Sequence, residues 1–287
     1  MKNIIMVSNL SKQYGESKVL NDISFNIETG SIFALLGTNG AGKTTALECI
    51  EGLRKYDSGE IIINGKIGVQ LQSASLPEGI RVNEALKLYS KWNGENVDYD
   101  FIDRLGIRDI LKKEYKSLST GQKRRLHLAL AMTGNPEIIF LDEPTAGLDV
   151  EGRSSLHEEI RRLNLSGKTI VLASHDMAEV ESLCDKLAIL KNGKIAFLGT
   201  VEELTKSFNS CYKVLLKADK NLSGKGLAQC KYNGENKDYY VYECEVIDSG
   251  MLEILTLARG EGLVVYDIKI ESSKLEDSFM DIARGEK

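Results

Sequence analysis

The sequence predicts an α/β protein with a central sheet of mostly parallel strands, followed by a smaller α+β unit. Two unbroken apolar runs, EIIFLDEP at 137–144 and TIVLASHD at 169–176, end in polar residues, as expected for parallel strands buried on both faces. A glycine-rich turn, GTNGAGKT, joins a third apolar run to a helical segment. After residue 209 the pattern changes to short strands and two further helices. We therefore expect a main domain over 1–209 and a small accessory domain over 210–287.

Composition limits the classes of function. The chain has 287 residues, of which 42% are hydrophobic and 28% charged, as in ordinary globular proteins. Its longest apolar runs fall far short of the roughly 20 residues of a membrane-spanning helix, and its start does not resemble a secretory signal. A net charge of −5 gives no electrostatic reason to expect nucleic acid as a partner. We expect a cytoplasmic chain whose five scattered cysteines, with no C-x-x-C pair, are buried and reduced.

Local sequence patterns predict the order of helices and strands along the chain. Strands are expected within 1–36, a helix over 44–53, strands again over 58–72 with a turn at Asn64-Gly65, and mostly helix over 82–113. In the accessory domain we expect strands at 212–217, 239–246 and 263–270, and helices at 250–262 and 274–285. So small a domain has a thin core and is expected to pack on the main domain or on a partner, either as a stabilising appendage or for regulation or dimer contact.

The turn GTNGAGKT matches the phosphate-binding pattern G-x-x-x-x-G-K-[ST], and it lies where that pattern requires, between a strand and a helix. Glycines allow backbone N–H groups to approach phosphate oxygens, and the helix N-terminus adds positive potential. Lys43 is expected to meet the β- and γ-phosphates and Thr44 to bind Mg²⁺. The nucleotide-binding residues expected here are Gly37, Thr38, Asn39, Gly40, Ala41, Gly42, Lys43, Thr44 and Thr45.

Polar residues at two strand ends complete the candidate catalytic set. Asp142 can hold Mg²⁺, while Glu143 can activate the attacking water, because neighbouring strand residues point to opposite sides. His175 follows the next strand, where its side chain can reach the γ-phosphate or the water. His127 and His157 lie within helical patterns and are interpreted as structural.

In this order, the motifs GTNGAGKT, LSTGQ, IIFLDEP, AGLD and SHD resemble the ATP-binding cassette (ABC) ATPase family over about Ile5 to Leu204. The resemblance implies ATP and Mg²⁺ as ligands and a P-loop cassette made of a RecA-like core, an antiparallel β subdomain and a short helical subdomain. It also assigns three further roles. Tyr14 resembles the aromatic that stacks on adenine, Gln72 the glutamine that links the catalytic Mg²⁺ site to the membrane partner, with Gln70 as the fallback, and Asp149 the aspartate that crosses to a partner cassette.

The resemblance gives LSTGQ, residues 118–122, a role in a second chain. In the family this signature completes the ATP site of the other subunit in a head-to-tail dimer, so Ser119, Thr120, Gly121 and Gln122 are expected to face a γ-phosphate. Physically, Ser119 is an N-cap and Gly121 permits close approach of the backbone. Thr120 departs from the usual glycine. The adjacent KRR is interpreted as a solvated helix face.

The brief helical insert and the small tail resemble the detached ATP-binding subunits of bacterial ABC-2-type exporters. This implies an ATP hydrolase that forms a dimer, most simply a homodimer, and that works with a separate membrane permease at the inner face of the cell membrane. The alternatives are a non-transport ABC ATPase for assembly or maintenance, and a nucleotide sensor without turnover. The sensor is disfavoured by the presence of both Glu143 and His175.

Overall fold

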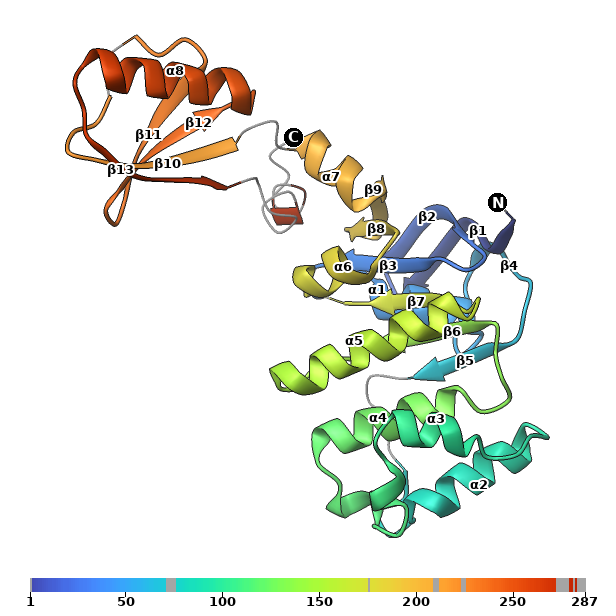
Figure 1. Cartoon of the computed structure of the whole chain (residues 1–287). Helices are drawn as coiled ribbons and strands as arrows, with labels where there is room; N and C mark the ends of the chain where they lie inside the picture. The colour runs from blue at the N-terminus through green and yellow to red at the C-terminus, as the bar shows by residue number, and fades with distance from the viewer. Residues whose placement is uncertain are drawn as a thin grey trace. The chain divides into compact units, whose positions relative to one another are not determined.

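A computed structural model describes residues 2–70, 76–174, 176–208, 212–222, 226–271, 279–280 and 282. The chain divides into two compact units, Met1–Val201 and Glu202–Lys287 (Figure 1). The sequence placed the division after residue 209. No helix among the described residues is long and apolar enough to cross a membrane.

The first unit is built on a six-stranded sheet with the order β5-β6-β7-β3-β8-β9. Neighbouring strands are parallel except that β9 runs antiparallel to β8. Every residue of β3, β6 and β7 is buried, which explains why these strands read as unbroken apolar runs. The strands are β3 (Ile32–Gly37), β5 (Ile67–Gln70), β6 (Ile138–Asp142), β7 (Thr169–Ala173), β8 (Lys186–Lys191) and β9 (Lys194–Gly199).

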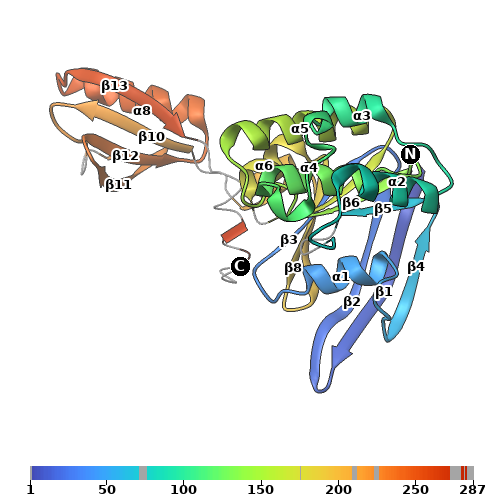
Figure 2. The same ribbon diagram turned by 90° about the horizontal axis from the view of Figure 1, so that it is seen from below.

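Alternate residues of the central strands serve two separate cores. Ile139 and Leu141 of β6 belong to the core beneath the helices α5 (Val150–Leu165) and α4 (Thr120–Ala131). Phe140, between them, belongs to the opposite core, which contains α1 (Lys43–Ile50) and the small antiparallel sheet. Figure 2 shows α1 on the same side of the central sheet as β1 and β2. The short helix α6 (Met177–Leu183) follows β7.

Two smaller elements complete the first unit. A three-stranded antiparallel sheet has the order β2-β1-β4, and its strands are β1 (Asn3–Tyr14), β2 (Ser17–Glu28) and β4 (Ser58–Ile63). A helical segment connects β5 to α4, and it contains α2 (Val82–Trp92), α3 (Tyr99–Arg104) and the 3₁₀ turns η1 (Arg108–Ile110) and η2 (Tyr115–Ser117). The expected helical character of 82–113 is confirmed.

The second unit begins with most of α7 (Val201–Phe208) and continues as an antiparallel sheet with the order β11-β12-β10-β13, covered on one face by α8 (Ile247–Gly260). Val214, Tyr242 and Ile254 form its separate core. Its strands are β10 (Tyr212–Ala218), β11 (Cys230–Asn236), β12 (Tyr239–Cys244) and β13 (Val265–Glu271). The sequence analysis missed β11, whose residues CKYNGEN lack an apolar alternation. The helix expected over 274–285 lies largely outside the described residues.

The expectation that all five cysteines are reduced was wrong for one pair. Cys230 and Cys244 form a disulfide between the paired strands β11 and β12, where they are direct cross-strand neighbours. Both are buried beneath α8, against Gly250. Cys49 and Cys184 are free, and Cys211 lies outside the described residues. A C-x-x-C search finds only cysteines that are close in sequence, so it cannot detect a pair created by strand register.

Candidate functional site

The glycine-rich turn joins β3 to α1, as the sequence predicted. Two of its glycines have no room for a side chain. A Cβ on Gly42, the N-cap of α1 with φ 107°, would lie 2.8 Å from the carbonyl oxygen of Val19. A Cβ on Gly37 would lie 2.6 Å from the carbonyl oxygen of Leu190. The loop can therefore follow this path only with glycine at both positions, and it leads directly into the N-terminus of α1, where the first backbone N–H groups have no partner within the helix.

Lys43 is the first residue of α1 and folds back over the loop. Its Nζ donates to the carbonyl oxygens of Gly37, at 2.6 Å, and Thr38, at 3.3 Å. Burial lowers the pKa of the amine, and the carboxylates of Glu143 and Asp142 oppose that shift. The lysine therefore lies close enough to Asp142, the last residue of β6, and to Glu143, which follows it, for their charges to interact.

The two carboxylates differ in backbone conformation. Asp142 ends β6 with 8% of its surface exposed, and burial, reinforced by Glu143, raises its pKa to about 6. Glu143 has already left the strand, because its φ of 48° is left-handed, and its N–H donates to the carbonyl oxygen of Ala173 at 2.9 Å. From the sequence, we expected the side chains of Asp142 and Glu143 to point in different directions because they are neighbours in a strand. That explanation does not apply to Glu143, which lies outside the strand. A left-handed glutamate costs backbone energy, and such strain clusters at functional sites.

A second buried carboxylate near Asp142, Glu51, was missed by the sequence analysis. It caps the C-terminal end of α1 and is 8% exposed. Burial first, then Asp142 and Glu48, raise its pKa to about 7. A charged residue directly after the buried helix residue Ile50 was the available signal. Glu51 adds negative potential beside the carboxylate of Asp142.

Two predicted residues, Gln72 and His175, lie outside the described residues. The fallback, Gln70, is the last residue of β5 and pairs with Leu141 of β6. It is 1% exposed, and neither its amide nitrogen nor its oxygen has a hydrogen-bond partner among the described residues. A buried amide without partners is costly, and Gln70 lies directly beside the strand that carries Asp142.

The signature LSTGQ starts α4 with a reciprocal cap. Ser119 Oγ accepts from the N–H of Gln122 at 3.3 Å, and Gln122 Oε1 accepts from the N–H of Ser119 at 3.2 Å. The predicted N-cap role of Ser119 is confirmed. The helix start opens onto a pocket of about 350 Å³ whose wall also includes Asp149, the N-cap of α5, and Arg125. The structure thus brings together the signature and the AGLD aspartate, which lie about 30 residues apart in sequence.

Different structural features account for the residue types at positions 120 and 121. A Cβ on Gly147 would lie 3.2 Å from the Thr120 methyl, so the threonine that departs from the family pattern packs against a glycine of the AGLD turn. Gly121 is helical, and a Cβ there would meet only Leu148, at an ordinary 3.4 Å. The fold of this chain does not require glycine at 121, so the space above it is free for a group from outside the chain.

Tyr14 ends β1 with 41% of its surface exposed. Two cations flank its ring: Lys12 Nζ lies 5.4 Å and the Arg54 guanidinium 5.5 Å from the ring centroid. The ring therefore keeps exposed surface on which a base can stack, and two cations lie beside it.

The histidines within helices are structural, as expected. His127 is buried and its Nε2 lies 3.1 Å from the Tyr115 hydroxyl. Burial, with Arg124 and Lys123 nearby, lowers its pKa to about 4, so the ring is neutral at pH 7. His157 lies 3.3 Å from Glu179.

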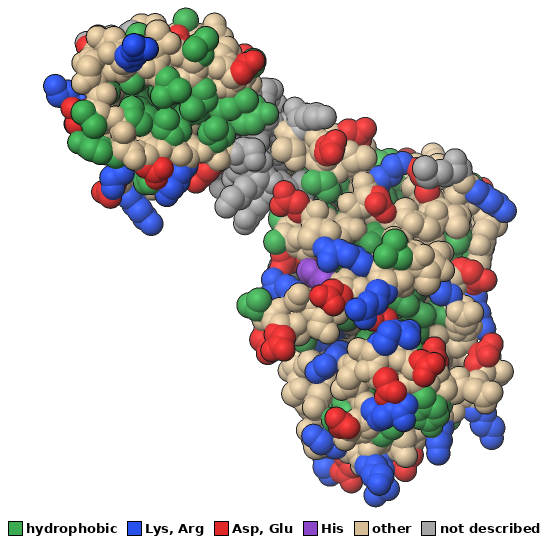
Figure 3. Space-filling model, in the orientation of Figure 1, with side chains coloured by type: hydrophobic (Ala, Val, Ile, Leu, Met, Phe, Trp, Pro, Cys, Tyr) green, Lys and Arg blue, Asp and Glu red, His purple; other side chains and the backbone are tan. Residues whose placement is uncertain are grey.

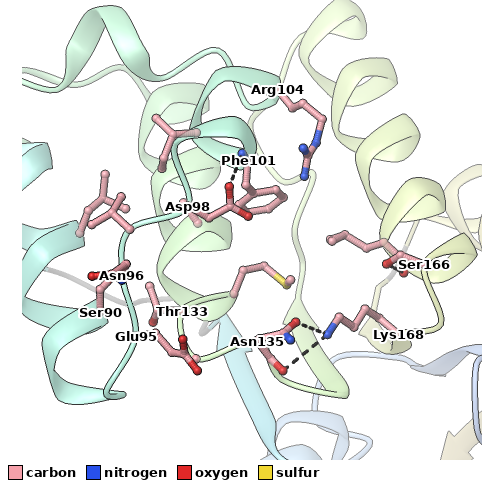
Figure 4. A pocket seen from close by; sticks show the side chains of 17 residues that line it. Ser90, Glu95, Asn96, Asp98, Phe101, Arg104, Thr133, Asn135, Ser166 and Lys168 are labelled. Carbon is pink, nitrogen blue, oxygen red and sulfur yellow. Dashed lines mark hydrogen bonds between the residues drawn. The ribbon is translucent and has the colours of Figure 1, made fainter.

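A further cavity of about 360 Å³ lies between α2, α3 and the C-terminal ends of α4 and α5 (Figure 4). None of the predicted site residues lines it. Asp98 at its wall caps α3 by accepting from the N–H of Phe101, and Lys168 donates to Asn135 Oδ1 at 2.5 Å. Asp98 thus stabilises the start of α3, Lys168 connects the segments that lead into β6 and β7, and no residue of the phosphate loop lines the cavity.

The site fits a magnesium nucleotide. Gly37 and Gly42 shape a cradle that a Cβ would fill, Lys43 adds a cation, and Asp142 supplies a carboxylate. No group of three or more His, Cys, Asp or Glu in the described part of the chain is placed to hold a metal alone. Mg²⁺ needs no such cage, because it retains water and binds phosphate oxygens together with one or two protein ligands such as Thr44 and Asp142.

Fold and site together define a P-loop nucleotide-binding ATPase with a second, capped helix start that opens onto a pocket, and comparisons with known proteins identify its family. Residues 20–146 match the family model described as ABC transporter. An uncharacterized ABC transporter ATP-binding protein of Methanocaldococcus jannaschii is 37% identical over 71% of this chain and 80% of that protein. The linearmycin resistance ATP-binding protein LnrL of Bacillus subtilis is 33% identical over 70% of each chain.

A solved structure of an ATP-binding subunit of an ABC transporter superposes with a TM-score of 0.66 and 27% identity, over 71% of this chain and 93% of the other. The chain belongs to the ABC transporter family and is an ABC ATPase, an ATP-binding subunit with the cassette fold that the sequence predicted.

Proposed function

We propose that this chain hydrolyses Mg·ATP as one half of a cassette dimer and drives a separate membrane permease of the ABC-2 type. The phosphate loop, Lys43, Asp142 and Glu143 supply binding and hydrolysis. The observation that carries the dimer is the signature pocket, where Ser119, Gly121 and Asp149 form a second anion-binding start with open space above a glycine that the fold does not need.

Each residue has a role in this mechanism. The loop N–H groups and Lys43 hold the β- and γ-phosphates, while Thr44 and Asp142 would hold Mg²⁺, which neutralises charge on the phosphate oxygens. Glu143 orients and deprotonates the attacking water, and Tyr14 stacks on adenine. Gln72 is assigned to the contact between the catalytic site and the permease, and His175 to the γ-phosphate. Ser119, Thr120, Gly121 and Gln122 contact the γ-phosphate held by the other copy.

Export is supported by the name of LnrL, which states linearmycin resistance, and by the short helical segment between β5 and α4. A resistance function fits removal of a compound from the cell. The chain would then lie at the cytoplasmic face of the membrane, held there by its permease. A non-transport ABC ATPase is the competing function.

Purification from detergent-solubilised native membranes separates these two functions. A multi-span protein that accompanies the chain in stoichiometric amount supports the transporter. Recovery of the chain only from the soluble fraction, with a soluble partner, contradicts it.

A mixed dimer tests the signature. Lys43→Ala destroys the phosphate loop but leaves the signature, and Gly121→Asp places a carboxylate against the γ-phosphate but leaves the loop. Each homodimer has two damaged sites, whereas a mixed dimer contains one whole site. Differently tagged, verified mixed dimers are therefore expected to trap an ATP analogue that neither parent traps.

The matched control mixes each single variant with the Lys43→Ala/Gly121→Asp double variant, because neither mixture contains a whole site. Trapping by the two single variants together, and by no control mixture, supports the proposal. Equal trapping in all mixtures would show that the signature does not act across subunits.

A further inference from the structure

Glu179 is a buried acidic residue that the proposed mechanism does not use. Charged side chains of both signs are spread over the visible face of the first unit (Figure 3), where water can solvate them. Glu179, in α6, is only 1% exposed. Burial of a carboxylate is costly unless hydrogen bonds replace the lost water. The partners of this side chain therefore indicate why the fold has an acidic residue at this position.

Two side chains contact the two oxygens of the Glu179 carboxylate. The hydroxyl of Ser174 donates to Oε2 at 2.5 Å, and His157 Nε2 lies 3.3 Å from Oε1. Because a carboxylate can only accept, Nε2 carries the proton of this second hydrogen bond. Ser174 is the residue that follows β7, and His157 lies on α5. Glu179 thus connects the end of a central strand to a helix.

Asp176 strengthens this connection. As the N-cap of α6, it accepts from the N–H of Glu179 at 3.2 Å through Oδ1, and its own N–H donates to Ser174 Oγ at 3.0 Å. Its other oxygen accepts from Arg153 Nη1 at 2.6 Å. Arg153 lies one turn before His157, so the same side of α5 holds both acidic residues. The hydroxyl of Ser174 is therefore fixed both as a donor and as an acceptor.

The end of β7 also holds the backbone of Glu143. The N–H of Glu143 donates to the carbonyl oxygen of Ala173 at 2.9 Å. This carbonyl belongs to the planar peptide group that joins Ala173 to Ser174. The φ of Glu143, 48°, is left-handed, and such a conformation persists only where the surrounding structure enforces it. A displacement of Ser174 would therefore move the acceptor that fixes Glu143.

Helix α5 holds the other end of the same loop. Its N-cap, Asp149, lies six residues after Glu143, so residues 144–148 run from a backbone fixed by β7 to the start of α5. Glu179 contacts both supports of this loop. No residue of the phosphate loop is among its hydrogen-bond partners in the described part of the chain.

We propose that Glu179 is a positioning residue for ATP hydrolysis. It holds the end of β7 against α5 and so keeps the Glu143 side chain where it can take a proton from the attacking water. This role rests on the proposed function of Glu143 as the base. It predicts that Glu179 controls the rate of hydrolysis and leaves the affinity for Mg·ATP nearly unchanged, because the phosphate loop lies outside these contacts.

The test uses the full chain in excess over ATP, so that a single turnover is measured, and calorimetry with a non-hydrolysable ATP analogue. Glu179→Ala removes both acceptor oxygens and is expected to lower the single-turnover rate at least roughly 10-fold, with the Kd for the analogue within about threefold of the parent. Glu179→Gln keeps an oxygen for Ser174 and an amide for His157, so its rate should lie within about threefold of the parent.

Leu183→Ala is the matched control for lost stability. Leu183 is a core residue at the end of the same helix, and its truncation leaves the contacts of Glu179 in place. It is expected to lower the unfolding midpoint, as Glu179→Ala does, but to keep the hydrolysis rate of the parent. Equal losses of hydrolysis in these two variants would overturn the proposal. Should Glu179→Ala not fold, Ser174→Ala removes only the hydroxyl and is expected to lower the rate at least roughly threefold.

A double-mutant cycle tests whether Glu143 is the group that is positioned. In a Glu143→Gln chain the base is absent, so addition of Glu179→Ala is expected to lower the residual rate less than about twofold. A loss as large as in the parent background, or an unchanged rate in Glu179→Ala alone, overturns the positioning role. Near-normal hydrolysis by Glu143→Gln alone refutes the base itself, and with it this role, so the two failures are distinguished.

Discussion

Lys43 Nζ donates to the carbonyl oxygen of Gly37 at 2.6 Å, so the lysine of the phosphate loop bonds to the first residue of its own loop. The same amine couples electrostatically to Glu143 and Asp142 at the end of β6. This one side chain therefore connects the ends of β3 and β6. When a nucleotide binds, the amine has to exchange its backbone carbonyl acceptors for phosphate oxygens.

Replacement of Lys43 by alanine should therefore reduce binding more than stability. Lys43→Ala removes charge-assisted hydrogen bonds to phosphate, which predicts a loss of about 3 kcal/mol or more, or roughly 100-fold in Kd for Mg·ATP by calorimetry. Lys18→Ala, at an exposed position of β2, is the control and should bind normally. Comparable affinities for the two variants would remove Lys43 from the site.

Substitutions of Glu143 are expected to lower the rate of ATP hydrolysis, and one of them is expected to raise the free energy of unfolding relative to the other. Glu143→Gln keeps the side-chain shape but removes the base, and we expect ATP hydrolysis to fall roughly 10² to 10⁴-fold while ATP binding is kept. Glu143→Gly is equally inactive but relieves the left-handed backbone, so its free energy of unfolding should exceed that of Glu143→Gln by about 1 kcal/mol. Steady-state turnover and denaturant titration measure the two effects. Near-normal turnover in Glu143→Gln would contradict the assignment of the base.

Glu51 predicts a specific pH dependence. Its pKa is raised from 4.5 to about 7 by burial, Asp142 and Glu48, so between pH 4.5 and 7 the folded chain binds more protons than the unfolded chain. The free energy of unfolding contributed by this group therefore decreases as pH rises through that window, by at most about 3 kcal/mol. Glu51→Gln should remove this decrease, measured as unfolding midpoints at several pH values. A parallel pH profile for parent and variant would show that Glu51 does not titrate in this range.

Local sequence patterns predicted the phosphate loop, the N-cap Ser119 and the buried parallel strands, because glycine spacing, capping residues and apolar runs act within a few residues. Other features depend on tertiary structure. Glu51 and Gln70 stand out because they are buried near Asp142. Their burial depends on where α1, β5 and β6 lie in the fold, so local sequence does not predict it. Similarly, the Cys230–Cys244 disulfide depends on the register of two strands, and β11 is a strand because β12 pairs with it rather than because of its own composition.

Two glycines of α8 offer a matched test of packing. Glycine to alanine within a helix is normally stabilising by up to about 1 kcal/mol. At Gly250, however, the new Cβ would lie 2.6 Å from Cys244 Sγ and 2.8 Å from Cys230 Sγ. Gly250→Ala should therefore destabilise the chain by about 1–3 kcal/mol. Gly260→Ala, at the end of the same helix with nothing near its Cβ position, should be neutral or stabilising. Denaturant titration of both variants measures the difference, and similar effects would contradict close packing of α8 on the disulfide.

Tyr14 provides the last test, because its ring is flanked by Lys12 and Arg54 and retains an open surface. If adenine stacks there, Tyr14→Ala should weaken Mg·ATP binding by about 1–3 kcal/mol, whereas Tyr14→Phe, which keeps the ring, should bind nearly as the parent does. Inorganic triphosphate lacks the base, so its affinity should be the same for all three chains. Calorimetry with both ligands separates stacking from a general distortion of the loop, since distortion would reduce triphosphate affinity as well. Unchanged ATP affinity in Tyr14→Ala would assign the adenine contact to another residue.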